Sequence, residues 1–317
     1  MASTIRSVAV VGSGVIGASW ALLFLNKGLR VVMSDPAQNA EEVFRKYITD
    51  AKTKEGRASE LQSFWERFEF VDDITTKLPE VDFVQENGPE RLELKERIIA
   101  SIDEHTRPDV VIASSSSGLP PSAFITKCER NPGRVLVGHP FNPPHLIPLV
   151  EVVPHPGSSE DSVTIALEFY RSLGKRPIRL HKEVPGFVAN RLQAAINNEA
   201  YSLITRGVVS ASDLDAAVSS GPGLRWALTG PIAINTLGGG GGASGFGQRL
   251  ERLGPSIRGW EQDILRNRFT WGETELAKLR DEVNKSFGET DWSEIIRERD
   301  AVLMSLLEDK QKASSLV

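Results

Sequence analysis

The sequence has almost no cysteine and no long apolar run, and these absences exclude several classes of protein. A single cysteine, Cys128, among 317 residues rules out an internal disulfide and a metal site built from cysteines. It suits a reducing compartment, and we interpret it as an inert side chain. No apolar run is long enough to cross a bilayer, and the first expected strand begins too close to Met1 to leave room for a signal peptide. We therefore expect a cytoplasmic protein that contacts no membrane.

The chain also has fewer basic residues than acidic residues. The chain has 37 Lys and Arg against 42 Asp and Glu, a formal net charge of −5, and no basic block. This balance gives no electrostatic reason to expect nucleic acid or an anionic membrane as a partner. A small anionic ligand would have to be met by local groups. The composition, 40% hydrophobic and 25% charged, is that of an ordinary soluble protein, and the length suggests two domains.

The most informative stretch is an apolar run that ends in three spaced glycines. Val8–Val11 predicts a buried strand, and Gly12-Ser13-Gly14-Val15-Ile16-Gly17 after it has the dinucleotide-binding form G-x-G-x-x-G. Gly12 is expected to make the tight turn, Gly14 to let a pyrophosphate approach the backbone, and Gly17 to let the next helix lie close to the strand. The N-terminus of that helix offers N–H groups to the phosphates.

A second predicted strand, Arg30–Ser34, is followed by Asp35, close to the spacing at which an acidic side chain meets an adenosine ribose. A carboxylate there repels a 2′-phosphate, and the next three residues, Pro36-Ala37-Gln38, supply no arginine to receive one. The pattern therefore favours NAD as the cofactor. The alternative is that Asp35 caps a helix in a strand–helix–strand unit that binds no nucleotide.

Strand and helix patterns alternate over the first 184 residues. Apolar segments at 68–71, 81–85 and 110–113 predict strands, and the amphipathic segment 91–103 predicts a helix between the last two. This succession is typical of a doubly wound sheet. From residue 185 onward the periodicity is helical. We therefore expect an α/β fold, with a Rossmann-type, mainly parallel sheet in residues 1–184 and a smaller all-α domain in residues 185–317.

Ligands bind beyond the carboxyl ends of the strands in such a sheet, and polar residues follow several strands here. His139 stands at a strand end with Glu151 on the next strand, so a hairpin-like return can place the carboxylate against the ring. A carboxylate fixes the tautomer and stabilises the imidazolium, which makes a histidine a general base. The alternative is a structural His–Glu contact. We expect the four other histidines to be solvated: His105, His145, His155 and His181.

Taken together, these motifs resemble the L-3-hydroxyacyl-CoA dehydrogenase family, most closely its branch containing λ-crystallin and L-gulonate 3-dehydrogenase. The likeness covers nearly the whole chain. It is carried by the glycine motif, the serine run Ser114–Ser117 and the segments Gly138–Pro144, Leu149–Val152 and Pro185–Leu192, in the family's order and at nearly its spacing. The resemblance implies an NAD-dependent dehydrogenase that forms a homodimer through the helical domain.

The resemblance also implies roles for single residues. It makes His139 the general base, Glu151 its orienting carboxylate, Ser117 a hydrogen-bond partner of the reacting oxygen, and Asn190 a polar anchor from the first helix of the second domain. These residues would be the catalytic group, and Ser117 and Asn190 would also touch the substrate.

Two further positions match the family near the nicotinamide-side ribose of the cofactor. These are Glu90 and Lys95. Each has a plainer alternative, since Glu90 can equally cap the helix that starts at Arg91, and Lys95 can be a solvated residue on that helix.

Departures from the family pattern bear on the substrate. Ser115 and Ser116 stand where acyl-CoA members carry Asn and Thr, and Gly118 stands where they carry a further serine. The Gly221–Pro231 segment, which we expect to be a turn, resembles the λ-crystallin branch and bacterial carnitine dehydrogenases. These differences weigh against a coenzyme A thioester and favour a small free L-3-hydroxy acid, such as L-gulonate.

A free acid needs a cation near the alcohol pocket, and Arg225 is our candidate. It lies beside Trp226 in the expected glycine-rich turn, and its planar fork can hold a carboxylate with two hydrogen bonds. The alternative is a surface arginine packed on Trp226 or paired with an acid.

Three other functions stay open at this point. One is a 3-hydroxyacyl-CoA dehydrogenase acting on a thioester such as 3-hydroxybutyryl-CoA, and another is a carnitine dehydrogenase. The third is a structural protein that binds NAD(H) without turnover, as λ-crystallin does. The sequence favours an enzyme, because a retired active site is free to lose parts and all four expected catalytic residues are present.

Overall fold

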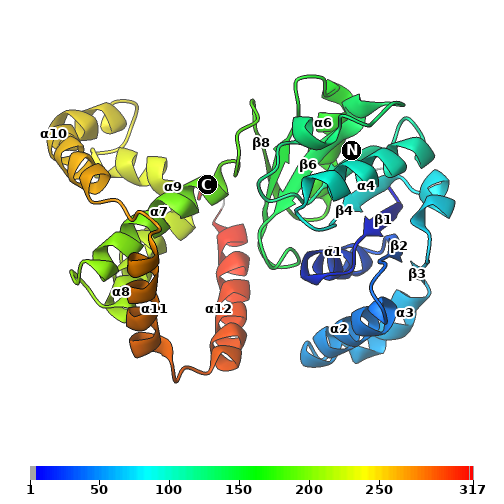
Figure 1. Ribbon diagram of the computed structural model, residues 1–317, viewed down its shortest axis with the longest axis horizontal. Coiled ribbons are helices and arrows are strands. Elements are labelled where there is room, and N and C mark those ends of the chain that lie inside the picture. Colours follow the sequence, from blue (N-terminus) through cyan, green and yellow to red (C-terminus); the bar gives the residue numbers. More distant parts are fainter. Residues whose placement is uncertain (1–4, 314, 317) are drawn as a thin grey trace. The chain divides into compact units, whose positions relative to one another are not determined.

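The computed structural model describes residues 5–313, 315 and 316, and it divides the chain into two compact units at the boundary between Arg191 and Leu192 (Figure 1). We call them the sheet unit and the helical unit. The expectation about a signal peptide concerns Met1–Thr4, which lie outside the described residues. Within the described part of the chain, no helix is long and apolar enough to cross a membrane.

Eight strands form one sheet in the sheet unit, in the order β3-β2-β1-β4-β5-β6-β7-β8. All neighbours run parallel except β6 and β7, which are antiparallel. The strands are β1 (Ser7–Val11), β2 (Arg30–Ser34), β3 (Phe68–Phe70), β4 (Phe83–Glu86), β5 (Val111–Ser114), β6 (Val135–Pro140), β7 (Leu149–Val153) and β8 (Arg176–Arg179). The strand order reverses between β1 and β4, which is where ligands bind in doubly wound sheets. The predicted Rossmann-type sheet is confirmed.

Helices cover both faces of this sheet, and each face buries its own core. The helices are α1 (Val15–Asn26), α2 (Ala40–Lys54), α3 (Leu61–Trp65), α4 (Leu92–His105), α5 (Pro121–Phe124) and α6 (Glu160–Ser172), with 3₁₀ turns at Ala58–Glu60, Ile74–Thr76, Leu78–Glu80 and Pro132–Arg134. On one face, Trp20 and Phe24 of α1 pack with Phe169 of α6. On the other, Ile99 of α4 packs in a cluster with Val84 of β4. The strands are apolar on both sides because both faces are buried.

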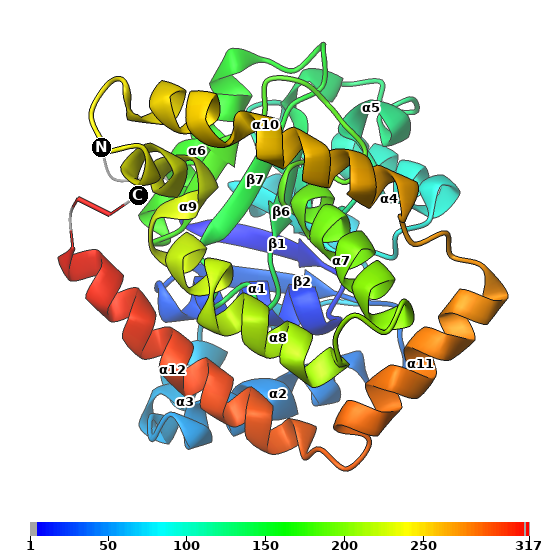
Figure 2. The same ribbon diagram turned by 90° about the vertical axis from the view of Figure 1, so that its left-hand side faces the viewer.

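The helical unit contains no strand among the described residues, and the expected all-α C-terminal domain is therefore confirmed. Its helices are α7 (Ala189–Thr205), which begins in the sheet unit, α8 (Ala211–Ser220), α9 (Pro222–Gly238), α10 (Gly245–Arg266), α11 (Glu273–Phe287) and α12 (Trp292–Lys312). Within this unit α9 packs against α8 and α10, and α11 packs against α8 (Figure 2).

The prediction of a turn over Gly221–Pro231 is wrong. Pro222 occupies the first turn of α9, where its missing N–H costs nothing, and the helix runs on from there. Gly230 interrupts it with a positive φ of 74°, directly before Pro231. Arg225 consequently lies on a helix and not in a loop.

Candidate active site

The glycine turn after β1 is built so closely that two of its positions have no room for a side chain. A Cβ on Gly12, whose φ is 95°, would lie 2.9 Å from the carbonyl oxygen of Asn87. A Cβ on Gly17 would lie 1.9 Å from the carbonyl oxygen of Gly12. A Cβ on Gly14 would meet no atom, and Gly14 is the N-cap of α1. The turn therefore fits the pyrophosphate of a dinucleotide, because the backbone at Gly14 is open and the N-terminus of α1 follows it.

Asp35 faces this turn from the end of β2. Its Oδ2 accepts hydrogen bonds from the Ser13 N–H at 2.6 Å and the Ser13 hydroxyl at 3.0 Å, and its Oδ1 accepts one from the Ala37 N–H at 2.8 Å. Burial acts to raise the pKa of Asp35, but these hydrogen bonds outweigh it and lower the pKa. Asp35 does not cap α2, whose N-cap is Asn39. A fixed negative charge therefore stands beside the glycine turn.

His139 and Glu151 face each other across the one antiparallel strand pair of the sheet. They are register partners in β6 and β7, and His139 Nδ1 lies 2.8 Å from Glu151 Oε2. The other carboxylate oxygen accepts the N–H groups of Val188 at 2.9 Å and Ala189 at 3.1 Å, where α7 begins. Burial acts to raise the pKa of Glu151, but the bonds from His139 and the two amides outweigh it and lower the pKa.

This geometry fixes what the imidazole can do. The ionised carboxylate accepts a hydrogen bond from Nδ1–H, so in the neutral ring Nε2 carries the lone pair. The rings of Phe141 and Phe187 pack on His139, with centroids 5.4 Å and 5.5 Å away. Phe187 is fully buried with a φ of 52°, a strained conformation for an aromatic residue. The ring is thus held on two sides with Nε2 available as a proton acceptor.

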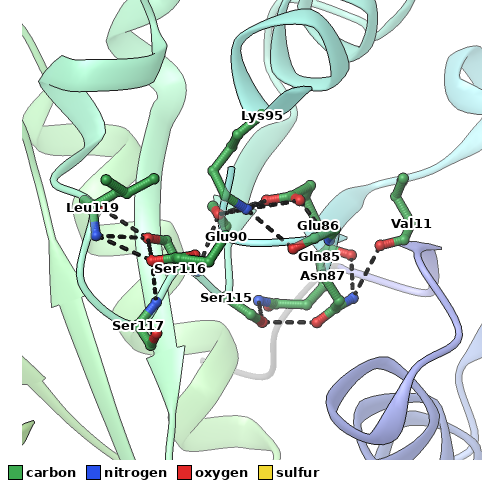
Figure 3. Close-up of polar contacts among 12 residues, drawn as sticks. Val11, Gln85, Glu86, Asn87, Glu90, Lys95, Ser115, Ser116, Ser117 and Leu119 are labelled. Carbon is green, nitrogen blue, oxygen red and sulfur yellow. Dashed lines mark hydrogen bonds and ion pairs between the residues drawn. The ribbon is translucent and has the colours of Figure 1, made fainter. Parts of the chain in front are cut away.

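The serine run forms a loop that closes around one carboxylate oxygen (Figure 3). Glu90 Oε1 accepts four hydrogen bonds from it: Ser116 Oγ at 2.7 Å, Ser117 N at 3.1 Å, Gly118 N at 2.9 Å and Leu119 N at 3.1 Å. Glu90 therefore does not cap α4, whose N-cap is Arg91 with no side-chain cap bond. Ser117 itself is exposed.

The same loop is joined to the segment that leads into α7. Asn190 Nδ2 donates to the carbonyl oxygen of Ser117 at 2.7 Å, and the Gly186 N–H donates to the carbonyl oxygen of Gly118 at 3.3 Å. Since neighbouring residues of this segment also bind Glu151, the structure brings Ser117 and Asn190 into one bonded assembly with the His139–Glu151 pair.

Lys95 is not solvated, and that alternative is wrong. Its side chain is 1% exposed, and Nζ lies 2.9 Å from both carboxylate oxygens of Glu86, which is fully buried. The Ser114 hydroxyl donates to the same carboxylate at 2.5 Å. The pairing of Lys95 with Glu86 was not predicted; the available signal was the position of Glu86 at the end of a strand, nine residues before Lys95. The ammonium thus braces the strand ends under the serine loop.

A chain of hydrogen bonds runs from α6 through β4 to the serine run and to the residue after β4; we call it the amide chain. Tyr170 and Gln85 are buried, and Ser115 and Asn87 are half-buried. The Tyr170 hydroxyl donates to Gln85 Oε1 at 2.7 Å, Gln85 Nε2 donates to Ser115 Oγ at 2.8 Å, and Ser115 Oγ donates to Asn87 Oδ1 at 2.7 Å. Gly138, beside the base, makes room for Tyr170, because a Cβ there would lie 2.0 Å from the tyrosine oxygen. The sequence does not predict this chain, because its members come from segments far apart along it.

The remaining predicted positions are the four other histidines and Arg225. His105 and His181 are exposed as expected, but His155 is buried, and the prediction that it is solvated is wrong. Its two ring nitrogens are satisfied by the Pro132 carbonyl at 3.0 Å and the Gly157 N–H at 3.0 Å. His145 is half-buried, with Nδ1 2.8 Å from Ser19 Oγ, so it is not solvated either. Arg225 is exposed on α9. Among the described residues, no group of His, Cys, Asp and Glu is arranged to hold a metal ion.

Comparison with known families and proteins agrees with this construction. Residues 7–184 match the 3-hydroxyacyl-CoA dehydrogenase NAD-binding domain, and residues 186–280 match the C-terminal domain of the same family. A Gibberella moniliformis protein named 3-hydroxyacyl-CoA dehydrogenase is 61% identical over 316 residues, which cover 100% of this chain and 98% of that protein. An L-carnitine dehydrogenase of Nocardiopsis dassonvillei is 39% identical, over 98% of this chain and 94% of its own.

Solved structures show the same similarity. The NAD⁺-dependent 5-formyl-3-hydroxy-2-methylpyridine 4-carboxylic acid 5-dehydrogenase superposes with a TM-score of 0.73 at 27% identity, covering 97% of this chain and 99% of that one. The 3-hydroxybutyryl-CoA dehydrogenase of Escherichia coli superposes with a TM-score of 0.64 at 29% identity, covering 74% of this chain and 49% of that one.

Proposed function

The chain belongs to the 3-hydroxyacyl-CoA dehydrogenase family of NAD-dependent dehydrogenases, and from this premise we propose that it oxidises the 3-hydroxyl group of a small free L-3-hydroxy acid, such as L-gulonate, to the 3-keto acid. The observation that carries the proposal is the buried His139–Glu151 pair, 2.8 Å apart, with one ring nitrogen left to accept a proton. The amides at the start of α7 hold the other carboxylate oxygen, which fixes the orientation of Glu151 against the ring.

The proposed reaction removes two hydrogens from the secondary alcohol, one from C3 and one from the hydroxyl oxygen, and each goes to a different acceptor. When bound, NAD would supply the acceptor for the hydride that leaves C3 with both electrons of the C–H bond. His139 takes the hydroxyl proton at Nε2 as the C=O bond forms, and Glu151 stabilises the imidazolium that results. The exposed hydroxyl of Ser117 hydrogen-bonds to the reacting oxygen, and Asn190 anchors the substrate beside it.

The same proposal assigns the cofactor contacts. The Gly12–Gly17 turn would hold the pyrophosphate, and Asp35 the adenosine ribose, after exchanging its bonds to Ser13 for ribose hydroxyls. Glu90 Oε1 accepts the hydrogen bonds of the serine loop, and the other carboxylate oxygen would accept hydrogen bonds from the nicotinamide-side ribose. Lys95 would act on the cofactor through the strand ends that it braces and not by direct contact, since its ammonium is enclosed.

Replacing the base tests the proposal. His139→Ala should lower kcat by about 10² to 10⁴ while the Kd for NADH stays near the wild-type value, because the imidazole acts on the proton and not on the nucleotide. His105→Ala is the matched control, since His105 is exposed and bonds only to its own helix through the Ser101 carbonyl at 2.8 Å. Unchanged turnover in His139→Ala would sink the assignment.

The substrate itself is tested by a side-by-side assay of NADH formation with L-gulonate, L-carnitine, 3-hydroxybutyrate and 3-hydroxybutyryl-CoA. L-Carnitine is the second candidate, because several relatives carry that name and it is also a free 3-hydroxy acid. Turnover restricted to the thioester would reject the free acid and favour the activity named for the Gibberella relative. NADH binding without turnover of any of the four would favour a λ-crystallin-like structural protein.

We also propose that the protein works in the cytoplasm as a homodimer formed through the helical unit. A groove of about 500 Å³ between α7, α8 and α10 is lined mainly by apolar side chains, and within it Glu199 Oε2 is buried without a hydrogen-bond partner among the described residues. Leu265 at its rim is 66% exposed. A second copy covering this face would bury that surface.

Light scattering after size exclusion tests the homodimer. Leu265→Lys should shift the dimer toward monomer, because it places a charge in the apolar contact. Val43→Lys on α2, where the side chain is 64% exposed, should not. A wild type that runs as a monomer at all concentrations would remove this part of the proposal.

A further inference from the structure

The loop that joins the two strands of the His139–Glu151 pair is held by a buried lysine that the proposed reaction does not use. This loop, Phe141–Pro148, leaves β6 two residues after His139 and enters β7 two residues before Glu151. Lys175 lies between α6 and β8 and is 8% exposed. Its Nζ donates to the carbonyl oxygen of Ile147 at 2.7 Å and also to that of Pro144.

The backbone around Lys175 ties the same loop to β8. The N–H of the next residue, Arg176, donates to the carbonyl oxygen of Pro148 at 2.8 Å. Arg176 is also the register partner of Leu149 in the parallel β7–β8 pair. The lysine side chain and its neighbour's backbone therefore hold three successive parts of one loop.

A second tie comes from α1, the helix of the glycine turn. Ser19 Oγ accepts the His145 N–H at 2.9 Å and lies 2.8 Å from the ring Nδ1 of the same histidine. Trp20, the next residue of α1, lies under Lys175, with Nζ 5.5 Å from its ring centroid. The loop is thus fixed between α1 and the start of β8.

Packing alone does not account for a lysine at this place. Burial lowers the pKa of Lys175 to about 7, and the charge of Lys27 adds to the effect, so the fold disfavours the ammonium. An apolar side chain of similar length would fill the space without that desolvation penalty. What an apolar side chain lacks is the ability to donate to two loop carbonyls.

We propose that Lys175 is a positioning residue for the catalytic pair: by holding the carbonyls of Pro144 and Ile147 it keeps Phe141 packed on His139 and keeps the ends of β6 and β7 in the register that sets His139 against Glu151. This inference rests on the proposed role of that pair as the base. Lys175 touches no reacting atom itself, because its donors are engaged in the loop and its side chain is buried. Its effect on the reaction passes through the loop.

Two substitutions separate positioning from packing. Lys175→Met keeps the length of the stem over Trp20 and removes every donor. Lys175→Gln is one bond shorter and keeps an N–H₂ group, so it can reach one carbonyl. Lys27→Met is the matched control, because it removes the neighbouring charge without touching the loop. Each variant is measured for kcat, for the KM of substrate, for the Kd of NADH, and for the ring N–H signals of isotope-labelled histidine by NMR.

The downfield Nδ1–H signal of His139, identified by its absence in His139→Ala, reports the bond to Glu151 without any turnover. We expect Lys175→Met to lower kcat about tenfold or more at unchanged NADH affinity and to shift or broaden this signal. Lys175→Gln should lower kcat less and change the His139 signal less than Lys175→Met does. Lys27→Met should change neither kcat nor the signal. Wild-type kcat with a wild-type signal in Lys175→Met would overturn the proposal. If Lys175→Met does not fold, wild-type values of both in Lys175→Gln would overturn it.

The two proposals fail in different ways. If His139 is not the base, His139→Ala keeps its turnover, whatever Lys175 does. If only the positioning role is wrong, His139→Ala loses turnover while the Lys175 variants leave the His139 signal in place.

Discussion

Replacing Glu151 with glutamine perturbs the candidate site by a single atom, and the structure indicates what should follow. The carboxylate accepts three hydrogen bonds, one from His139 and two from the amides of Val188 and Ala189. An amide has one acceptor atom and one donor group at the corresponding positions. If its oxygen stays on the two backbone N–H groups, its NH₂ faces His139 Nδ1 and donates to it. The imidazole then carries its own proton on Nε2, where it cannot accept another.

The size of the loss follows from the bond that is given up. To act as a base in Glu151→Gln, His139 must give up the carboxylate bond in its productive tautomer, and a hydrogen bond to a charged group is worth about 1.5–3 kcal/mol. At about 1.4 kcal/mol for each factor of ten, kcat should fall roughly 10- to 150-fold. The fall should be smaller than in His139→Ala, which removes the imidazole altogether.

The assay is NADH formation at saturating substrate and cofactor, with NADH binding measured separately. Glu160→Gln is the matched control, because Glu160 is an exposed carboxylate paired with Arg179 and lies on α6, away from the base. We expect Glu151→Gln to bind NADH like the wild type. A variant that turns over at the wild-type rate, or that loses more than His139→Ala, would refute the tautomer argument.

Glu151 also makes a prediction about acid stability. Its folded pKa is lowered from the ordinary 4.5, so its ionised form stabilises the fold above that value, and the contribution is lost as the pH falls through the folded pKa. The unfolding free energy of the wild type should therefore drop more steeply than that of Glu151→Gln between about pH 5 and about pH 3 in urea titrations. Parallel curves for the two proteins would contradict it.

The other predictions concern the cofactor, the buried ion pair and the substrate cation. Asp35→Ala should relax the preference for NAD over NADP in steady-state assays, since the ribose acceptor and the repelling charge leave together, and a wild type that uses both equally would reject this role. Lys95→Met should cost about 3–5 kcal/mol in urea unfolding because it leaves Glu86 charged and buried, whereas Lys127→Met, which breaks an exposed pair, should cost about 1 kcal/mol or less; similar losses would show that burial is not the cause. Arg225→Met should raise the KM for a free acid roughly tenfold or more at unchanged NAD affinity, and an unchanged KM would assign Arg225 to the surface.

The sheet and the contact between His139 and Glu151 could be predicted from the sequence because both depend on residues that are close together along the chain. Glycines at 12, 14 and 17 follow a single apolar strand, and the return that sets His139 against Glu151 spans only twelve residues. His139 at a strand end, with Glu151 on the next strand after a hairpin-like return, was enough to suggest that the two side chains meet. The structure adds that they are direct register partners.

Other features could not be predicted, either because they depend on contacts between segments far apart in the sequence or because one local sequence pattern fits two structures. A helix cap was an open alternative for Glu90 because it precedes α4, yet its partners lie 26 to 29 residues later. A solvated side chain was an open alternative for Lys95 because no sequence pattern marks Glu86 as its buried partner. Proline is common both in loop turns and in the first turn of a helix, so Pro222 did not distinguish the two. This is why Arg225 was predicted to lie in a turn when it lies on a helix.

The amide chain has a consequence for how effects of mutation combine. Tyr170, Gln85, Ser115 and Asn87 bond α6, β4 and the serine run to one another. The Asn87 N–H also donates to the carbonyl oxygen of Val11, directly before the glycine turn, and Gln85 Nε2 lies 3.4 Å from the carbonyl oxygen of Gly138, on the strand that carries the base. Segments joined in this way open to solvent together, so their amide protons should exchange as one cooperative block. Substitutions at the nucleotide turn and at the base strand then act on a shared element, and their free energies should not add. In this protein, defects in cofactor affinity and in proton transfer are therefore coupled quantities, even though the residues that produce them lie on different strands.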